Sequence, residues 1–550
     1  MLASTLCLLA VLVSAVLAAP LAPRAAPTVQ LDQGTFIGAT DGTLNKFLGI
    51  PFGKAPVGDL RFNLPVAVDP YNGTHTVTSF GPSCPQQAVN FNFPSQLEAD
   101  AVNYIINSIY QIVFPAQEDC LNLNVIVPAG TKPNANLPVV ARDWYAFIPG
   151  VTDRMTLIIA QLSASWPARK SKKPEWAISG CKIVSAQLTT PWKAVEIDIA
   201  YLTSPIERLA LRWIQKYISA FGGDPTKVTM CMGRERGAIS VALHLITNGG
   251  NSEGLFRGAF MQSGSPIPVG DITHGQADYD TLVSETGCSG AADTLQCLRQ
   301  VPYDKLKKAV DASPGIFSPN SLRLTWLPRV DGKFLTDTPQ NLVQQGSVAN
   351  VPFVTGDCDD EGTLFSLSTL NITTEEELRS YVTSNYLPQA ENKNVDQLFT
   401  LYPADITQGS PFDTGVLNAL TPQYKRLAAM QGDLVFQAPR RYFLQHRSDK
   451  QSTWSFLSKR LKGLPDLGSA HATDILNIFG GGELADYLIN FANNLDPNGN
   501  TVPSWPKYSA SSPKLLTFTD DVVHPVTLTN DDYRVDAIDY ITQLSLQFPI

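Results

Sequence analysis

The sequence carries little charge, and basic residues are the minority of it. Charged side chains make up 17% of the 550 residues, with 50 acidic against 41 basic positions and a net charge of −9. A nucleic-acid-binding protein typically shows a basic surplus or a basic stripe, so the composition argues against that class. The hydrophobic fraction of 44% excludes a disordered or fibrous chain and provides enough apolar surface for a large core.

Long apolar runs are absent beyond the first twenty residues. The one such run, Leu2 to Ala19, has no Lys or Arg before it and is followed by several prolines. It is typical of an export signal cleaved after Ala18, with an uncleaved signal anchor as the alternative. We therefore expect a signal peptide over 1–18 and a secreted, extracellular protein. Glycosylation triplets at Asn72 and Asn371 fit that route.

Cysteines are few, and the number expected in the mature protein is odd. Of eight cysteines, Cys7 lies in the signal region, which leaves seven. Secretion favours disulfides, and an odd count leaves at least one thiol unpaired. Cys288 and Cys297 are close in sequence and are expected to pair, and Cys84 with Cys120 is the next pair.

Repeats, low-complexity tracts and clear linkers are also absent, so we expect one domain over 28–550. Short apolar runs separated by turns over 28–62 predict antiparallel strands at the N-terminus. The expected strands after this region are 121–128, 137–140, 228–232 and 256–262, and the expected helices are 207–220 and 237–246. This alternation predicts an α/β fold with a central, mostly parallel sheet flanked by helices.

Eight short motifs occur in order along the chain. They are Phe47–Phe52, Pro56–Phe62, Glu118–Val125, Leu209–Trp213, Phe221–Pro225, Gln262–Gly264, Asp360–Thr363 and Trp505–Tyr508. Together they resemble the type-B carboxylesterase/lipase family, the α/β-hydrolase branch that contains cholinesterases, carboxylesterases and Candida rugosa-type lipases. The resemblance covers 28–140 and 208–550 and fails between them. It implies an α/β-hydrolase fold.

The resemblance also implies a site for ester hydrolysis. Such enzymes need a nucleophile, a base, an orienting acid and an oxyanion hole, with the triad in the chain order Ser, Asp or Glu, His. Glu361 matches the triad acid of the family, and His471 matches the base. The other five histidines have no matching motif, and His244 is expected to be a packing residue inside a helix. Neither a metal nor an organic cofactor is implied.

Two parts of this machinery are missing from the sequence. The family has a strand, Gly-Glu-Ser-Ala-Gly and a helix, whereas residues 233–237 read Gly-Arg-Glu-Arg-Gly, with Glu235 where the serine is expected. The glycine-rich oxyanion turn expected after Val140 is also absent. Residues 141–207 instead carry a basic cluster at 169–173. Central strands are buried on both faces, and burying these charges there would carry a large desolvation cost. We therefore expect 141–207 to be an irregular stretch that disrupts the domain.

Three explanations remain open for these aberrant segments, at about 141–207 and 230–237. The chain is an inactive relative, or Glu235 acts as a carboxylate nucleophile, or the reading frame of the gene is wrong. Codons that encode Met232 to Gly237 can, shifted by one base, encode Trp-Gly-Glu-Ser-Ala-Gly, the elbow of the family with its preceding tryptophan. This coincidence favours the frame error.

A loop closed by the expected Cys84–Cys120 pair contains an amphipathic segment at 97–113. In the lipase members of the family a loop at this position is a lid, and a packed surface helix is the alternative. The expected function is therefore that of a secreted carboxylesterase or lipase acting on small-molecule or lipid esters, with transient contact to a lipid interface and no nucleic-acid partner. The rival is an inactive hydrolase-fold binding protein. Acyl-chain preference and oligomeric state stay open.

Overall fold

The computed structural model describes residues 25–85, 87 and 88, 116–144, 155–159, 199–233, 235–479 and 481–550. The predicted signal peptide, the amphipathic segment at 97–113 and the basic cluster at 169–173 lie outside these residues. Within the described chain, no helix combines the length and the apolar character needed to cross a membrane.

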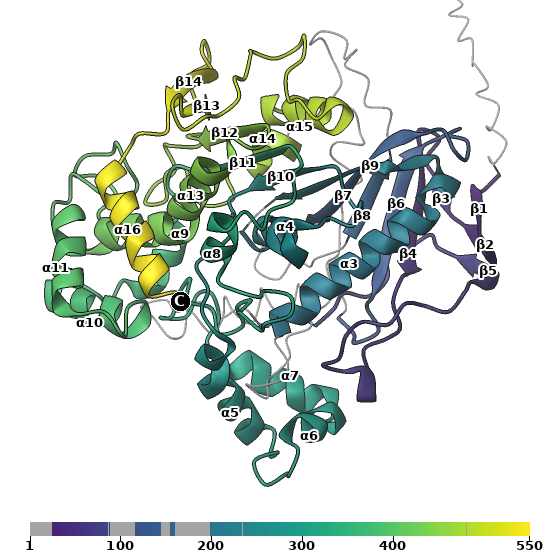
Figure 1. Ribbon diagram of the computed structural model, residues 1–550, viewed down its shortest axis with the longest axis horizontal. Coiled ribbons are helices and arrows are strands. Elements are labelled where there is room, and N and C mark those ends of the chain that lie inside the picture. The colour runs from purple at the N-terminus through teal and green to yellow at the C-terminus, as the bar shows by residue number, and fades with distance from the viewer. Residues whose placement is uncertain are drawn as a thin grey trace, which may run out of the picture.

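An eleven-stranded twisted sheet forms the centre of the protein (Figure 1). In spatial order its strands are β14 (Val526–Asn530), β13 (Lys514–Phe518), β12 (Thr453–Ser458), β11 (Phe353–Cys358), β10 (Gly258–Gln262), β9 (Gly223–Gly233), β7 (Leu137–Trp144), β8 (Met155–Ile159), β6 (Asn122–Pro128), β4 (Leu44–Pro51) and β3 (Ala39–Thr40). The strands from β13 to β7 run parallel to one another. The expected mostly parallel sheet is therefore confirmed.

The antiparallel strands expected over 28–62 are present. Strand β4 pairs antiparallel with β3 and β6, and β1 (Thr28–Leu31) pairs antiparallel with β2 (Gln33–Ile37) in a separate three-stranded sheet. The third strand there, β5 (Asn72–Thr76), runs parallel to β2. It reaches β2 after a long connection through β3 and β4, a crossover that parallel pairing requires and that local patterning does not reveal.

Parts of the suspect segment 141–207 belong to the fold. Strand β7 continues through Trp144, and β8 lies between β7 and β6, antiparallel to the first and parallel to the second. Helix α3 begins at Ile199, earlier than the expected start at residue 207, and Pro205 lies inside it. The described parts of the segment are therefore regular, and the expectation of an irregular stretch stays a prediction for 145–154 and 160–198.

Helices cover both faces of the sheet. Successive residues of a strand point to opposite faces, and Met261 of β10 packs in one buried cluster whereas Phe260 packs in another. The first cluster contains side chains of α3 (Ile199–Tyr217), α4 (Glu235–Ile246), α8 (Pro339–Gln344), α13 (Ala438–Arg447) and α16 (Val535–Gln547). The second contains side chains of α14 (Ile475–Phe479) and α15 (Glu483–Asn494).

The remaining helices extend this scaffold at its margins. Helices α9 (Thr363–Ser366), α10 (Glu375–Asn385), α11 (Asn392–Leu401) and α12 (Tyr424–Gly432) lie beside the first face, and a π-helical turn (Asp433–Gln437) joins α12 to α13. Helices α5 (Gln276–Glu285), α6 (Thr294–Gln300) and α7 (Tyr303–Ala312) form a separate lobe with its own small core. This lobe projects below the sheet in Figure 1.

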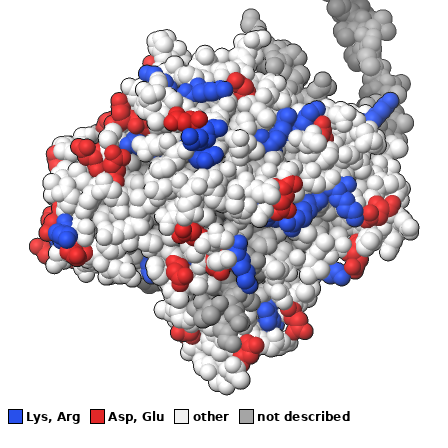
Figure 2. Space-filling model, in the orientation of Figure 1, with Lys and Arg blue, Asp and Glu red and all other residues white. Residues whose placement is uncertain are grey.

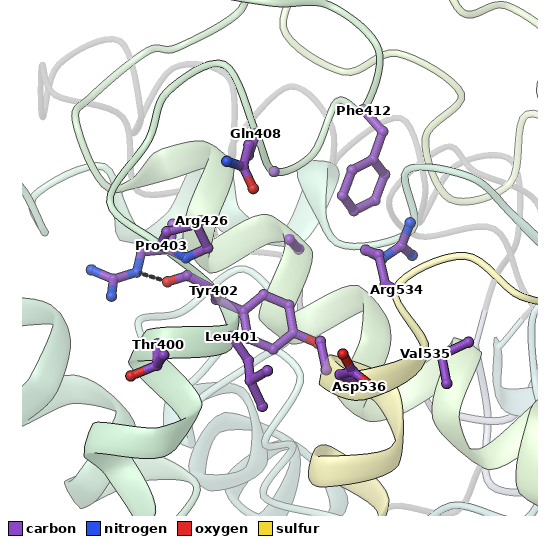
Figure 3. Close-up of a pocket in the computed structure, with 13 residues that line it drawn as sticks. Thr400, Leu401, Tyr402, Pro403, Gln408, Phe412, Arg426, Arg534, Val535 and Asp536 are labelled. Atoms are coloured by element: carbon purple, nitrogen blue, oxygen red, sulfur yellow. Dashed lines mark hydrogen bonds between the residues drawn. The ribbon is translucent and has the colours of Figure 1, made fainter.

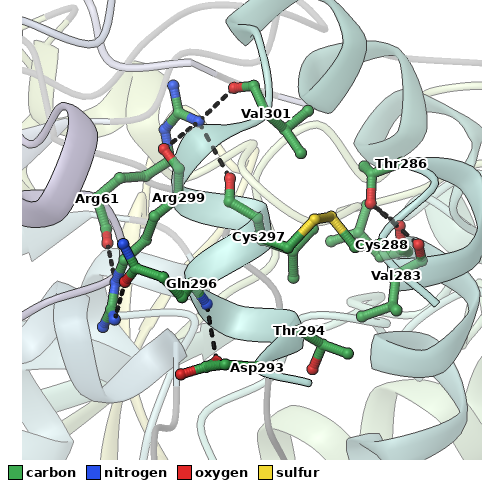
Figure 4. The surroundings of a disulfide bond; sticks show 12 residues. Arg61, Val283, Thr286, Cys288, Asp293, Thr294, Gln296, Cys297, Arg299 and Val301 are labelled. Carbon is green, nitrogen blue, oxygen red and sulfur yellow. Dashed lines mark hydrogen bonds between the residues drawn. A yellow bond between two sulfur atoms is a disulfide. The ribbon is translucent and has the colours of Figure 1, made fainter. Parts of the chain in front are cut away.

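The structure contains the disulfides Cys84–Cys120 and Cys288–Cys297. The second joins the end of α5 to α6, and the guanidinium group of Arg61 donates hydrogen bonds to three backbone carbonyls beside it (Figure 4). Within the described residues, Cys231 and Cys358 form no disulfide, and both are buried. Cys181 lies outside the described residues.

We expect removal of the two disulfides to have unequal effects on stability. Cys84 and Cys120 are 36 residues apart, whereas Cys288 and Cys297 are 9 apart. Loop-closure entropy predicts a loss of about 4 kcal/mol in the free energy of unfolding for the first pair and about 3 kcal/mol for the second. Urea unfolding of the two Cys→Ser double variants measures both losses, and a larger loss from the second pair would contradict this ranking.

Candidate active site

The carboxyl ends of the central strands meet at one edge of the sheet. Gly233, the last residue of β9, is in register with Gln262 at the end of β10, and Gln262 is in register with Gly356 in β11. Parallel strands in open α/β sheets place the segments that follow them along this edge, where ligands bind. The start of α4, the loop that carries Glu361 and the loop after β12 therefore converge here.

His471 and Glu361 are in direct contact at this edge. Nδ1 of His471 lies 2.6 Å from Oε2 of Glu361, although 110 residues separate them. Both side chains are almost completely buried. The imidazole also packs against the rings of Phe365 and Phe436, at centroid distances of 5.2 and 5.1 Å. The ring is thus fixed by a carboxyl group at one nitrogen and by aromatic contacts on its sides.

Burial changes the protonation of this pair. Removal from water raises the pKa of Glu361 to about 8, against the opposing effect of the nearby Ser263 hydroxyl and of the hydrogen bond from the Cys358 backbone N–H. The Cys358 N–H donates to Oε1 of Glu361 over 2.6 Å. Above about pH 8, Glu361 is a carboxylate that can accept a hydrogen bond from Nδ1–H of His471.

The strand–turn–helix expected at the nucleophile position is present. Strand β9 ends at Gly233 and α4 begins at Glu235, so a single residue separates the two elements. The side chains of Arg234 and Glu235 lie outside the described part. Trp144 at the end of β7 is in register with Gly233, so the chain after β7 leaves at the same edge. The oxyanion turn is expected there, and residues 145–150 are likewise not among those described.

Ser263 is a site residue that the sequence analysis missed. It follows β10, is completely buried and has a φ of 54°, which a residue other than glycine adopts rarely. Its hydroxyl lies close enough to Glu361 to lower the pKa of that carboxyl group, without forming a hydrogen bond of ordinary geometry. Ser263 lies in one of the eight motifs, Gln262–Gly264, but this motif does not reveal which residue the serine side chain approaches. Strained backbone of this kind concentrates at functional sites.

The structure also describes both predicted glycosylation sites and the histidine expected to pack inside a helix. Asn72 and Asn371 are exposed. His244 is completely buried in α4, and its Nε2 lies 2.8 Å from Glu207, whose carboxylate also accepts the Ser240 hydroxyl. Within the described chain, no three His, Cys, Asp or Glu side chains are grouped so that they could hold a metal ion.

A cavity of about 370 Å³ lies between the end of α11, α12 and the start of α16 (Figure 3). Neither Glu361 nor His471 lines it. Both of its guanidinium groups have protein partners, Arg534 with Asp433 and Arg426 with the Tyr402 carbonyl. The cavity is therefore separate from the paired histidine and glutamate.

Comparison with known proteins places the chain among esterases and lipases. Residues 25–142 and 207–535 match the profile of the "Carboxylesterase family", with a gap where the motifs fail. Lipase 4 of Diutina rugosa is 42% identical, over 89% of this chain and 90% of its own. Secreted lipase 1 of Botryotinia fuckeliana is 37% identical, over 94% and 93%.

Solved structures share the fold at lower identity. The crystal structure of Aspergillus niger EstA superposes with a TM-score of 0.73 at 21% identity, over 96% of this chain and 99% of that chain. The sheet order and the family match agree with this likeness. The chain therefore belongs to the carboxylesterase family and has its α/β-hydrolase fold.

Proposed function

We propose that this gene encodes a secreted serine ester hydrolase, a carboxylesterase or lipase that uses His471 as base and Glu361 as orienting acid. The observation that carries the proposal is the 2.6 Å contact between Nδ1 of His471 and Glu361, at the sheet edge beside the β9–α4 turn. A histidine held by a buried carboxylate next to a strand–turn–helix elbow has the arrangement that activates a serine hydroxyl. Relatives named lipases at 37–42% identity support the same class.

The reaction follows from these positions. A serine at the elbow attacks the ester carbonyl carbon while Nε2 of His471 takes its proton, and Glu361 stabilises the resulting imidazolium. The tetrahedral intermediate expels the alcohol, which receives that proton, and leaves an acyl-enzyme. Water then attacks the acyl carbon with the histidine as base again, and the carboxylic acid and the free serine are released.

The printed chain lacks the serine, and we propose that the reading frame explains this. Glu235 occupies the nucleophile position, and a one-base shift over Met232 to Gly237 permits Gly-Glu-Ser-Ala-Gly. The family match stops at 142 and resumes at 207, which supports a second aberrant segment. Glu235 as nucleophile is disfavoured, because the arginines on both sides would pair with its carboxylate.

The experiment that tests the proposal is to sequence the spliced transcript across codons 137–240. We expect it to restore a glycine-rich turn after β7 and Gly-Glu-Ser-Ala-Gly after β9, and the protein made from it to hydrolyse p-nitrophenyl butyrate. A transcript that encodes Gly-Arg-Glu-Arg-Gly would instead leave the triad incomplete. The purified protein should then be inactive, and the rival proposal, a hydrolase-fold binding protein, would take its place.

We also propose that the protein is exported. The apolar run at 1–18 precedes a family domain that starts near residue 25, and both proposed glycosylation sites, Asn72 and Asn371, are exposed. Two disulfides fit an oxidising compartment. A nucleic-acid partner is not expected, because basic and acidic side chains are interspersed on the face that Figure 2 shows.

Lipid esters are the proposed alternative to small soluble esters as substrates. If the loop between Cys84 and Cys120 is a lid that opens on lipid, hydrolysis of a long-chain ester should rise abruptly once its concentration exceeds the solubility limit. A short-chain ester, soluble throughout, serves as the control. Smooth saturation kinetics through the limit would indicate a packed helix and an esterase rather than a lipase.

A further inference from the structure

The carboxylate of Asp360 joins three segments of the chain. Its Oδ1 accepts hydrogen bonds from the Ser410 hydroxyl at 3.0 Å and the Phe412 backbone N–H at 2.8 Å. Its Oδ2 accepts from the Lys462 ammonium at 2.6 Å and the Ser469 backbone N–H at 2.8 Å. The side chain is completely buried. All four contacts come from residues more than forty positions away in the sequence.

The segment that contains Ser469 also carries His471. The Asp360 backbone N–H donates to the Ser469 carbonyl at 3.1 Å, and Asp360 forms a parallel bridge with Ala470. Gly468, with a φ of 59°, permits the close approach, because a Cβ atom there would lie 2.4 Å from Oδ2 of Asp360. Residues 468–471 are therefore held through their backbone by Asp360 on one side.

Consecutive residues thus act on the same histidine in different ways. Glu361 binds the imidazole ring directly, whereas Asp360 fixes the main chain from which that ring projects. The ring contact at 2.6 Å requires the loop to stay at one distance from the end of β11. Activity depends steeply on such placement, since a shift of about 1 Å in a catalytic group can cost about 100-fold in rate.

We propose that Asp360 is a positioning residue, whose carboxylate locks residues 468–471 so that Glu361 binds Nδ1 of His471. The proposal rests on the proposed function only in taking His471 as the base. Neutralising Lys462 does not explain the burial of Asp360, because Lys462 also lies 2.6 Å from Asp359. Lys462 would keep a carboxylate partner without Asp360.

The Asp360→Asn variant tests this in the full chain as printed, without any need for ester hydrolysis. The amide keeps the shape of the side chain but replaces one of the two acceptor oxygens with an NH2 donor. An NH2 group in the place of Oδ2 cannot accept the hydrogen bonds of the Ser469 N–H and the Lys462 ammonium. With ¹⁵N-labelled histidine, the Nδ1 resonance of His471 is assigned by its loss in His471→Gln. We expect Asp360→Asn to abolish the signature of the Nδ1 hydrogen bond to Glu361.

The matched control is Asp331→Asn. Oδ1 of Asp331 also accepts backbone N–H groups, those of Lys333, Phe334 and Leu335 at 2.9–3.0 Å. This control should lower stability but leave the His471 resonance unchanged. An unchanged resonance in Asp360→Asn, or the same change in both variants, would overturn the positioning role.

A second variant keeps the proposal testable if Asp360→Asn does not fold. Gly468→Ala retains both carboxylates but places a methyl group against Asp360, and it should also disturb the Nδ1 signal. In the enzyme made from the corrected transcript, Asp360→Asn should lower kcat about 100-fold with little change in KM. If the wild-type signal is present but no ester is hydrolysed, the proposed function fails while the positioning role stands.

Discussion

Replacing His471 with glutamine in the protein made from the corrected transcript should lower kcat for a soluble ester by about 10⁴-fold or more. Glutamine has no titrating nitrogen to take the proton of the attacking serine, and the imidazole is the group that Glu361 contacts at 2.6 Å. Substrate binding does not depend on this proton transfer, so KM should change little. Steady-state hydrolysis of p-nitrophenyl butyrate measures both parameters.

The controls separate loss of the base from loss of the fold. His524 is largely exposed in the turn between β13 and β14, and His524→Gln should keep full activity. Because burial raises the pKa of Glu361 to about 8, Glu361 becomes the carboxylate that orients His471 only above that pH, and kcat/KM of the wild type should rise through about pH 8. A His471→Gln enzyme that retains a tenth of wild-type kcat would refute the assignment of the base.

The resemblance to the family predicts this pair, because the segments around Glu361 and His471 match those that carry the family's triad acid and base. Glu361 lies in the loop after β11 and His471 in the loop after β12, and these neighbouring parallel strands, which were not among the predicted ones, bring the two residues together. The alternation of strands and helices likewise predicts the mostly parallel sheet, since each element buries its own apolar face. The motifs and the alternation of strands and helices can both be recognised from short stretches of sequence.

What the sequence does not reveal depends on contacts between distant residues. Nothing local marks Ser263 as a neighbour of Glu361, or Asp360 as the acceptor for residues 410–412 and 469. Strand β8 was not predicted either, because its place between β7 and β6 depends on pairing with both. Such positions are fixed by tertiary packing, which overrides local preference.

Replacing Arg440 with methionine should lower the free energy of unfolding by about 3–5 kcal/mol. The guanidinium group is completely buried and lies 2.9 Å from Asp357 in β11 and 2.8 Å from Asp531 near the start of α16. Methionine fills much of the volume but leaves two buried carboxyl groups without their main partner. Urea unfolding at pH 7 measures the loss, and a change below about 1 kcal/mol would contradict it.

Asp357→Asn is the matched variant, and we expect it to cost much less than Arg440→Met. Burial raises the pKa of Asp357 to about 8 despite the neighbouring Arg440, so this carboxyl group is largely neutral at pH 7 and an amide resembles it. The charge that Arg440 must balance is therefore mainly that of Asp531. If both variants lost the same free energy of unfolding, the stabilising partner of Arg440 would be Asp357 rather than Asp531.

The pH dependence of stability provides an independent test of the same assignment. Although burial opposes ionisation, the charges of Arg440 and Arg441 hold the pKa of Asp531 to about 2, below its ordinary value of 3.8. A carboxyl group with a lowered pKa stabilises the fold above pH 3.8 and loses that contribution as the pH falls to 2, about 2 kcal/mol in all. In Arg440→Met only Arg441 remains, at 2.9 Å from Asp531, so the loss between pH 4 and pH 2 should be smaller than in the wild type.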